Sequence, residues 1–341
     1  MRVSLRHVEL SLRHRFTLSR SSDDVRHSVL LRIEHEELTG LGEAAPSRRY
    51  GESAEGASAF LRGLDLSRFE DPFRLDEILL AVAEKSADNN AAKAALDMAL
   101  HDWIGKKLRL PLWKYWGLDR AKSPRTSYTI GIDSPQIVAK KVREADPFPL
   151  LKVKLGVPSD REIVQAIREV TSKPITVDAN EGWKSKEEAL DQILWLEERG
   201  IEFVEQPLSA KDLDGTAWLR ERVHVPLFAD ESITGLKDLQ RLKGVFDGIN
   251  IKLMKCGGLK EAMNLIGEAR ATGMKILLGC MIETSLGISA AAQLSPLADY
   301  ADLDGNLLIS NDPFTGVTVH DGKLILNDLP GLGVSESAAA R

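Results

Sequence analysis

The chain has 341 residues, 43% of them hydrophobic and 28% charged, which is enough apolar sequence to bury a large core. The 45 Lys and Arg residues against 51 Asp and Glu residues leave a net charge of −6, which argues against nucleic acid as a partner. The N-terminal stretch lacks the continuous apolar core of a secretory signal, and no apolar run of about 18 residues predicts a membrane span. Cys256 and Cys280 form neither a CxxC pair nor a disulfide framework. We therefore expect a cytoplasmic protein without membrane contacts.

Residues 1–120 are predicted to form an α+β capping domain. Apolar and polar residues alternate around 3–11 and 29–43, as in half-buried strands, and helical patterns follow from residue 52 to about 117. Residues 311–341 contain short apolar alternations between Gly and Asp residues, and we expect this segment to return to the cap.

Residues 121–310 are predicted to form a catalytic barrel, because short β-branched runs alternate with longer amphipathic segments. Eight runs have the character of strands: 127–131, 150–155, 175–180, 201–206, 227–231, 248–254, 275–281 and 300–305. Helical segments between them begin at start signals such as Ser159-Asp160 and Ser185. Several strands are continuously hydrophobic, which favours an α/β fold of the (β/α)8 barrel type. An open doubly wound sheet is the alternative, but the first strand is not followed by GxGxxG.

Three carboxylates occupy the ends of consecutive predicted strands: Asp178, Glu205 and Asp230. Active sites of barrels lie at the carboxyl ends of the strands, and neighbouring strands are about 4.8 Å apart. Carboxylates at such short separations repel one another unless a cation lies among them. Ligation by oxygen atoms alone suits Mg²⁺ better than Zn²⁺. The structural alternative is that one or two of them cap helices or pair with arginines on the rim.

Lysines lie at the ends of two strands that are four apart in the ring, Lys154 on the second and Lys252 on the sixth. Side chains from these strands approach the barrel axis from opposite sides, so each amine would face one side of a bound substrate. A lysine acts as a base only when its pKa falls towards about 7–8, and a neighbouring ammonium such as Lys152 lowers it. Lys152 is also suited to neutralising a bound carboxylate. Schiff-base formation, or simple bridging of carboxylates, remains the alternative.

Asp302 and Asp304 stand two residues apart at the end of the eighth strand, where they would form an acidic pocket for an ammonium group or cap the loop. The Gly257-Gly258 pair after the sixth strand would serve a phosphate-binding turn or, as we expect, the geometry of a tight loop.

Several motifs together resemble the enolase superfamily, in particular its muconate-lactonizing-enzyme-like branch and the dipeptide epimerases within it. The matching stretches are NAAKAALDMALHDWIG at 90–105, followed in the same order by LKVKLG, VDANEGW, VEQP, ADES, NIKLMKCGGL, GCMIETSLGISAAA and DLDG. Each motif is short and unspecific, but they follow the order of the family and cover nearly the whole chain.

The resemblance implies roles for these residues. Asp178, Glu205 and Asp230 would bind one Mg²⁺, and Lys154 and Lys252 would act as acid and base. A lysine base with Mg²⁺ stabilising an enediolate is the chemistry established for this superfamily. A mandelate-racemase type of site would carry an Asp on the sixth strand, where this chain has Lys252.

The resemblance also implies which residues bind the substrate. Asp302 and Asp304 would hold its N-terminal ammonium, and Ile282 would line the pocket. Arg20 matches loosely a basic residue that binds a glutamate side chain, with Arg48 and Arg49 as rival cations.

These observations predict a Mg²⁺-dependent dipeptide epimerase of the L-Ala-D/L-Glu type, acting on peptides released from the cell wall. It would invert the α-carbon of the C-terminal residue by transferring protons between two lysines. Hydrophobic dipeptides are the alternative substrates, and an N-acylamino-acid racemase or o-succinylbenzoate synthase is the alternative enzyme. A barrel that binds metal and ligand without turnover is the non-enzymatic alternative. We expect a small-molecule substrate as the partner and allow for a homo-oligomer.

Overall fold

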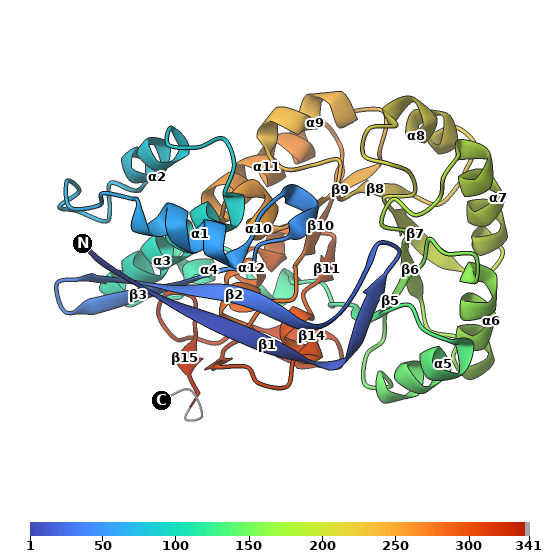
Figure 1. Cartoon of the computed structure of the whole chain (residues 1–341), viewed down its shortest axis with the longest axis horizontal. Helices are drawn as coiled ribbons and strands as arrows, with labels where there is room; N and C mark the ends of the chain where they lie inside the picture. The colour runs from blue at the N-terminus through green and yellow to red at the C-terminus, as the bar shows by residue number, and fades with distance from the viewer. Residues whose placement is uncertain (338–341) are drawn as a thin grey trace.

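The computed structural model describes residues 1–337. Figure 1 shows a smaller cap beside a larger ring of strands and helices. The cap begins with an antiparallel sheet of β1 (Arg2–Leu18), β2 (Ser21–His35) and β3 (Leu38–Ala44), with β2 in the middle. The β1–β2 hairpin is long, and its tip extends from the cap across the ring towards β5 (Leu151–Lys154) (Figure 1). Residues from the cap thereby reach the mouth of the ring.

Two cap helices, α1 (Ala54–Arg62) and α3 (Asn90–Leu108), pack against this sheet. The other two, α2 (Leu75–Ala83) and α4 (Leu112–Tyr115), pack against α3. Helix α3 is alanine-rich and almost wholly buried, so it buries residues on every side rather than on one stripe. It approaches β3 closely because β3 carries glycine: a Cβ at Gly42 would lie 1.9 Å from the carbonyl oxygen of Ala95. The strands and helices expected before residue 120 are present.

Eight parallel strands form the ring in chain order, which rules out the doubly wound alternative. Besides β5 they are β4 (Tyr128–Ile130), β6 (Ile175–Asp178), β7 (Ile201–Glu205), β8 (Leu227–Ala229), β9 (Gly248–Ile251), β10 (Lys275–Gly279) and β11 (Tyr300–Asp302). A parallel bridge between Thr126 and Ala301 joins the two ends, and Ser127 N donates to Ala301 O at 3.0 Å. The predicted barrel is therefore confirmed, and all eight strands lie within the predicted runs.

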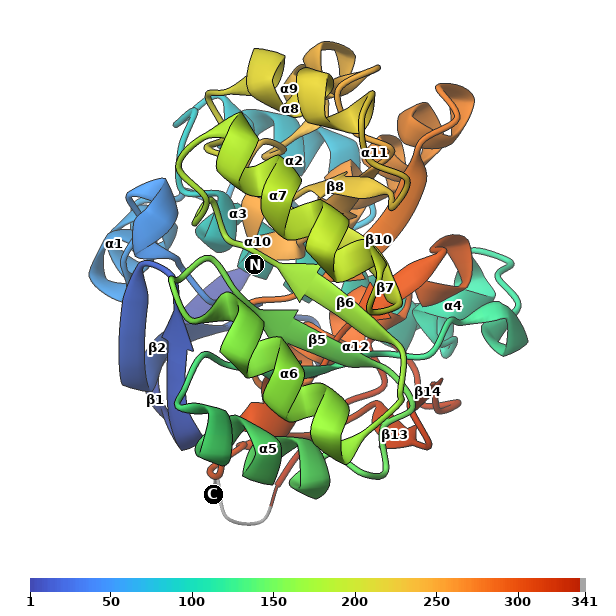
Figure 2. The same cartoon turned by 90° about the vertical axis from the view of Figure 1, so that its right-hand side faces the viewer.

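Helices cover the outside of the barrel, as Figure 2 shows for α5 to α7 over β5 to β7. They are α5 (Pro135–Glu144), α6 (Asp160–Val170), α7 (Lys186–Glu197), α8 (Leu213–Arg220), α9 (Leu236–Leu242) and α11 (Leu259–Ala271). The short α10 (Leu253–Cys256) packs against α3 of the cap, and α12 (Ser285–Ala292) packs against β3.

Two local predictions differ from the structure. The sixth strand ends at Ile251, because the chain turns into α10 and Lys252 becomes the residue that precedes this helix. The eighth strand is followed by a short 3-10 helix, Gly305–Leu308, and not by an α-helix. From there the chain returns to the cap, where Ser310 N donates to Ser11 O at 2.9 Å.

The C-terminal segment contacts the cap helices. Leu112 N donates to Gly331 O at 3.1 Å, and Leu332 N donates to the Asp102 carboxylate in α3 at 2.9 Å. The division of the chain at residues 120 and 310 stays a prediction. Within residues 1–337, every helix is too short or too polar to cross a bilayer.

Candidate active site

Three buried carboxylates meet at the carboxyl ends of neighbouring strands. The parallel register pairs Lys154 with Asp178 and Asp178 with Glu205, so β5, β6 and β7 place these side chains at one level. Asp230 follows directly after β8. Oxygen atoms of Asp178, Glu205 and Asp230 lie within 4.8 Å of one another, and all three residues are buried. This oxygen-only cluster fits a hard divalent cation such as Mg²⁺.

Four buried lysines surround the carboxylates. Lys154 Nζ lies 2.6 Å from Asp178 Oδ2, and Lys252 Nζ lies 2.7 Å from Asp230 Oδ2. Lys152 Nζ lies 2.7 Å from both Glu205 Oε2 and Asp302 Oδ2. Lys255 also binds the Asp230 carboxylate, and it donates to Asn250 O at 3.0 Å.

The pKa values of the carboxylates differ because the charges around them differ. Burial opposes ionisation of Asp178, but the ammonium groups of Lys154 and Lys152 outweigh it and hold its pKa below the usual range. Burial, together with the charge of Asp178, raises the pKa of Glu205 to about 8. A cation bound among the three carboxylates would favour the ionised form of Glu205.

The carboxylates in turn shift the pKa values of the lysines. Burial opposes the charged forms of Lys252 and Lys152, but the nearby carboxylates outweigh burial and raise both pKa values above that of a free lysine. For Lys252 this direction is opposite to the lowering that we expected for a lysine base, because the charge of Asp230 outweighs that of Lys152. Lys152 is thus a positive charge at the centre of the site.

Asp302 and Asp304 lie side by side on the opposite wall. Asp302 accepts hydrogen bonds from Lys152 and from Ser127 Oγ at 2.8 Å, while Asp304 accepts one from Thr129 N at 2.6 Å. Burial and the neighbouring Asp302 raise the pKa of Asp304 to about 7. A cationic group placed here would relieve that repulsion.

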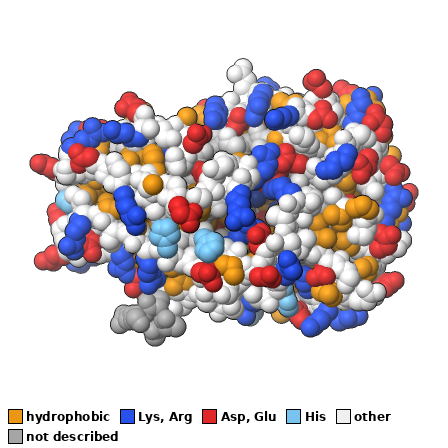
Figure 3. Space-filling model, viewed as in Figure 1, with side chains coloured by type: hydrophobic (Ala, Val, Ile, Leu, Met, Phe, Trp, Pro, Cys, Tyr) orange, Lys and Arg blue, Asp and Glu red, His pale blue; other side chains and the backbone are white. Residues whose placement is uncertain are grey.

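A cavity between the barrel mouth and the cap brings most of the predicted site residues together. Its wall includes Lys154, Lys252, Asp302, Asp304, Ile282 and Arg20. The β1–β2 hairpin covers it with Phe16, Leu18, Arg26 and His27. Figure 3 shows Lys and Arg side chains gathered near the middle of the face where cap and barrel meet.

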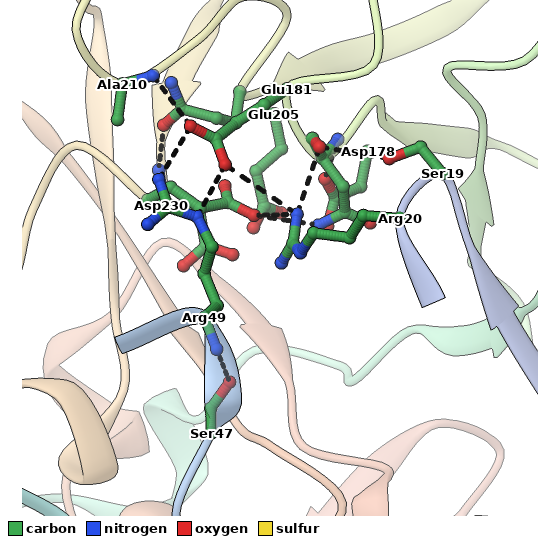
Figure 4. A network of polar contacts seen from close by, with 12 residues as sticks. Ser19, Arg20, Ser47, Arg49, Asp178, Glu181, Glu205, Ala210 and Asp230 are labelled. Atoms are coloured by element: carbon green, nitrogen blue, oxygen red, sulfur yellow. Dashed lines mark hydrogen bonds and ion pairs between the residues drawn. The ribbon is translucent and has the colours of Figure 1, made fainter. Parts of the chain in front are cut away.

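The three arginines predicted as rivals occupy different places. Arg20, next to the hairpin turn, donates to Asn180 O at 3.0 Å and pairs with Glu231 at 2.7 Å. Arg49 forms two hydrogen bonds with Glu181, at 2.7 and 2.8 Å. Figure 4 shows both arginines reaching from the cap towards the strand ends. Arg48 and Arg49 are absent from the described residues that line the cavity, whereas Arg20 lines it.

Sequence reasoning missed three charged residues of this region: Lys255, Glu231 and Arg26. Lys255 and Glu231 are buried beside Asp230, and Arg26 lies in the cavity wall. Lys255 stands three residues after Lys252, and Glu231 directly follows Asp230, so their positions within the motifs could have indicated them. Arg26 gave none, because it stands in an alternating strand where a charge reads as solvent-exposed.

Comparison with known proteins agrees with this architecture. Residues 1–117 match the family model described as mandelate racemase/muconate lactonizing enzyme, N-terminal domain, and residues 137–340 match enolase C-terminal domain-like. The chain belongs to the mandelate racemase/muconate lactonizing enzyme branch of the enolase superfamily. It is 51% identical over 335 residues to an L-Ala-D/L-Glu epimerase of Bacteroides thetaiotaomicron, covering 98% of this chain and 88% of that protein.

Solved structures of the enolase superfamily show the same fold. A dipeptide epimerase of Enterococcus faecalis, complexed with Mg and the dipeptide L-Leu-L-Tyr, superposes with a TM-score of 0.91 at 35% identity, covering 98% of this chain and 99% of that one. A substrate-liganded L-Ala-D/L-Glu epimerase of Bacillus subtilis has a TM-score of 0.91 at 30% identity, with 99% of each chain covered.

Proposed function

We propose that this enzyme is a Mg²⁺-dependent dipeptide epimerase that inverts the α-carbon of the C-terminal residue. The observation that carries the proposal is the convergence of two lysines, from β5 and the end of β9, on one cavity that also contains Asp302 and Asp304. A carboxylate trio able to hold a metal ion lies beside them. The relatives that are epimerases of dipeptides support the same reaction.

Asp178, Glu205 and Asp230 would hold the metal ion. A bound Mg²⁺ would offset the negative charge that develops on the substrate carboxylate when the α-proton leaves. Lys152 would add to this stabilisation, because its ammonium group lies among Glu205, Asp178 and Asp302. The buried position of Lys152 makes its charge effective, since water is excluded around it.

Lys154 and Lys252 would move the protons. One amine removes the α-proton from one side of the carbon, and the other, as an ammonium group, returns a proton to the opposite side, so the configuration inverts. Their strands are four apart in the ring, which places the amines on opposite sides of the barrel axis. Each lysine acts as the base for the epimer whose α-proton points towards it, so the reaction runs in both directions.

Asp302 and Asp304 would bind the N-terminal ammonium of the dipeptide. Burial and then the charge of Asp302 raise the pKa of Asp304, and a bound ammonium group would favour its ionised form. A free ammonium group distinguishes a dipeptide from an N-acylamino acid, so this pair favours dipeptides over the substrates of the racemase alternative. Ile282 would pack against the substrate in the same part of the cavity.

An acidic C-terminal side chain, as in L-Ala-D/L-Glu, is the substrate that the charges of the cap support best. Arg20 lines the cavity and would contribute positive potential there, although Glu231 and Asn180 occupy its Nη1. Metabolism of peptides released from the cell wall, in the cytoplasm, is the physiological setting that we propose for this specificity.

Incubation of the Mg²⁺-loaded protein with a dipeptide panel in D₂O tests the proposal. The panel contains L-Ala-L-Glu, L-Ala-L-Gln, L-Leu-L-Tyr and N-acetyl-L-glutamate. We expect NMR to show deuterium at the α-carbon of the C-terminal residue and formation of the second epimer for dipeptides. A protein with both Lys154→Met and Lys252→Met is the control, because it keeps the metal ligands. Absence of deuterium from every dipeptide, or exchange of N-acetyl-L-glutamate alone, would overturn the proposal.

A further inference from the structure

The backbone enters the left-handed region just after two of the strands that carry the metal-binding carboxylates. In the barrel, whose residues the structure describes throughout, the residues other than glycine with positive φ are Asn180 at 45°, Glu181 at 64° and Gln206 at 39°. Asn180 stands two residues after Asp178, and Gln206 directly follows Glu205. Such conformations are unfavourable for residues with a Cβ, persist only where the surroundings enforce them, and cluster at functional sites.

The side chain of Gln206 is fully buried and uses its whole hydrogen-bonding capacity. Its Oε1 accepts from Asp230 N at 3.0 Å and from Ser232 N at 3.1 Å. Its Nε2 donates to Leu208 O at 2.9 Å and to Ser232 Oγ at 3.0 Å. An amide oxygen has two acceptor positions and an amide nitrogen has two hydrogens, so all four are used. The two backbone N–H groups also fix the orientation of the amide, because a reversed amide would face them with its own hydrogens.

These bonds extend the contact between β7 and β8 beyond its last backbone pair. The register ends with Glu205 opposite Phe228, so Asp230, which follows β8, lies outside the strand. Gln206 holds the N–H group of Asp230, and Lys255 Nζ holds its carbonyl oxygen at 2.6 Å. The direction in which the Asp230 carboxylate points therefore depends on Gln206.

The left-handed backbone of Gln206 explains why its side chain takes over this contact. Gln206 N donates to Phe228 O at 2.9 Å, and the next bond of a regular parallel ladder would run from Asp230 N to Gln206 O. Gln206 O instead turns towards the segment after β6, where it accepts from Glu181 N at 3.0 Å. The side-chain oxygen replaces it at Asp230 N.

The same link continues to the third carboxylate. Asn180, in the turn that Gln206 O holds, donates its N–H to Asp178 Oδ1 at 2.9 Å. Gln206 thereby connects the segments that follow β6, β7 and β8, and each of these strands precedes or carries one carboxylate of the cluster. Gln206 is not among the described residues of the cavity wall, so any effect on the reaction acts through the carboxylates.

We propose that Gln206 is a positioning residue that preorganises the metal site, holding the three carboxylates close together before the cation binds. Like charges at such separations repel one another, and a rigid link between the strand ends opposes their movement apart. Mg²⁺ in particular demands ligands in nearly ideal positions. The inference rests on the metal site of the proposed function.

The Gln206→Asn variant tests this role because it shortens the amide by one methylene group. Asparagine is tolerated in the left-handed region, so the turn can form, but its side-chain oxygen falls short of Asp230 N. We expect isothermal titration calorimetry to show a Mg²⁺ affinity roughly 10- to 100-fold lower, the range for residues that orient metal ligands. Ca²⁺ accepts irregular geometry more readily, so its affinity should fall less and the selectivity for Mg²⁺ over Ca²⁺ should decrease.

The matched control is Gln293→Asn, the same change in a second buried amide. Gln293 follows α12, where its Oε1 accepts from Trp113 N at 2.9 Å and its Nε2 donates to Leu332 O at 3.1 Å. This control should lower the melting temperature, because buried hydrogen bonds are lost, but leave the affinities for both cations unchanged.

A second control lies within the same network. Ser232→Ala removes one acceptor of Gln206 Nε2 but leaves Oε1 on Asp230 N, so it should also keep the affinity for Mg²⁺.

Hydrogen exchange in the unsubstituted protein gives a test that does not depend on the folding of a variant. The amides of Asp230 and Ser232 should be protected in the metal-free protein. Mg²⁺ should increase their protection no more than that of β10, a strand without a carboxylate of the cluster.

The possible results are distinct. The inference would be overturned by an unchanged Mg²⁺ affinity in Gln206→Asn, by an equal loss of Mg²⁺ and Ca²⁺ affinity there, or by the same loss in either control. It would also be overturned if Asp230 and Ser232 became protected only with Mg²⁺. Each of these results would leave the proposed function standing. Absence of Mg²⁺ binding to the unsubstituted protein would overturn the metal site of the proposed function and this inference with it.

Discussion

The Glu205→Gln substitution tests the proposed metal site, because it removes one negative charge with little change in shape. Glu205 is fully buried, with Oε2 bound to Lys152 and Oε1 bound to Asn250 Nδ2, each at 2.7 Å. Its pKa of about 8 means that the metal-free protein holds this carboxyl largely protonated at pH 7. An amide therefore replaces a group that is already neutral, and its NH2 can donate to Asn250 Oδ1, which has no hydrogen-bond partner, once the Asn250 amide turns over. We expect the metal-free variant to be about as stable as the original protein.

Binding of Mg²⁺ should respond very differently. Loss of a group that merely orients a metal ligand typically costs 10- to 100-fold in affinity, so loss of a ligand should weaken binding by about 100-fold or more. At a Mg²⁺ concentration 100 times the original Kd, binding stabilises the folded protein by about 2.7 kcal/mol, and a 100-fold weaker site contributes about 0.4 kcal/mol. The difference of about 2.3 kcal/mol corresponds to a loss of about 3 °C in the Mg²⁺-dependent rise of Tm for a chain of this length.

Isothermal titration calorimetry and thermal melts with and without Mg²⁺ measure both quantities. The raised pKa of Glu205 also means that Mg²⁺ must displace a proton below pH 8, so affinity should fall as the pH decreases from 8, by at most about tenfold per pH unit for this group. In Glu205→Gln this contribution should vanish. A Kd within tenfold of the original, or a metal-free variant that melts several degrees lower, would refute the reasoning and assign Glu205 to charge pairing with Lys152.

Three further substitutions probe other parts of the site. Asp304→Asn should raise KM for L-Ala-L-Glu by roughly tenfold or more but leave KM for N-acetyl-L-Ala-L-Glu unchanged, because only a free ammonium group interacts with the charge of Asp304. Equal changes in KM for the two compounds in steady-state kinetics would contradict this role. Burial and then Glu43 raise the pKa of Glu283 to about 8, so this carboxyl is neutral when folded and ionised when unfolded between about pH 4.5 and 8, and stability should fall as the pH rises through that range. Glu283→Gln should reduce the loss of folding stability between pH 5 and pH 8 by about 1–3 kcal/mol, as measured by urea melts at the two pH values. An equal loss of stability in the variant and the original protein would be inconsistent with a neutral buried carboxyl. Lys255→Met should destabilise the fold by about 3 kcal/mol yet keep Mg²⁺ binding, since Lys252 still pairs with Asp230; a loss of Mg²⁺ binding would instead make Lys255 part of the metal site.

The barrel and the placement of its strand-end residues could be predicted from the sequence. Asp178 and Glu205 end buried parallel strands, and the regular geometry of such strands fixes where a side chain at the last position lies. Neither residue depends on a loop for its position, which is why local pattern was sufficient.

Residues outside the strands could not be placed in the same way. Lys255 belongs to a four-residue helix, and its burial follows from contacts with Asp230 and Asn250 that no local pattern contains. The orientation of Arg26 depends on a hairpin whose pairing shifts between Ser11 and Phe16, and sequence periodicity does not reveal such a shift. The missing eighth α-helix likewise depends on contacts between the chain after β11 and the cap.

The two-lysine mechanism is tested most directly by following α-proton exchange in two single variants, Lys154→Met and Lys252→Met, with L-Ala-L-Glu and L-Ala-D-Glu in D₂O. A lysine that remains alone can remove and return a proton on its own side, so it exchanges one epimer without inverting it. We predict that each variant incorporates deuterium into one epimer only, that the two variants choose opposite epimers, and that neither interconverts them. Interconversion by either variant, or exchange of the same epimer by both, would contradict the two-lysine account.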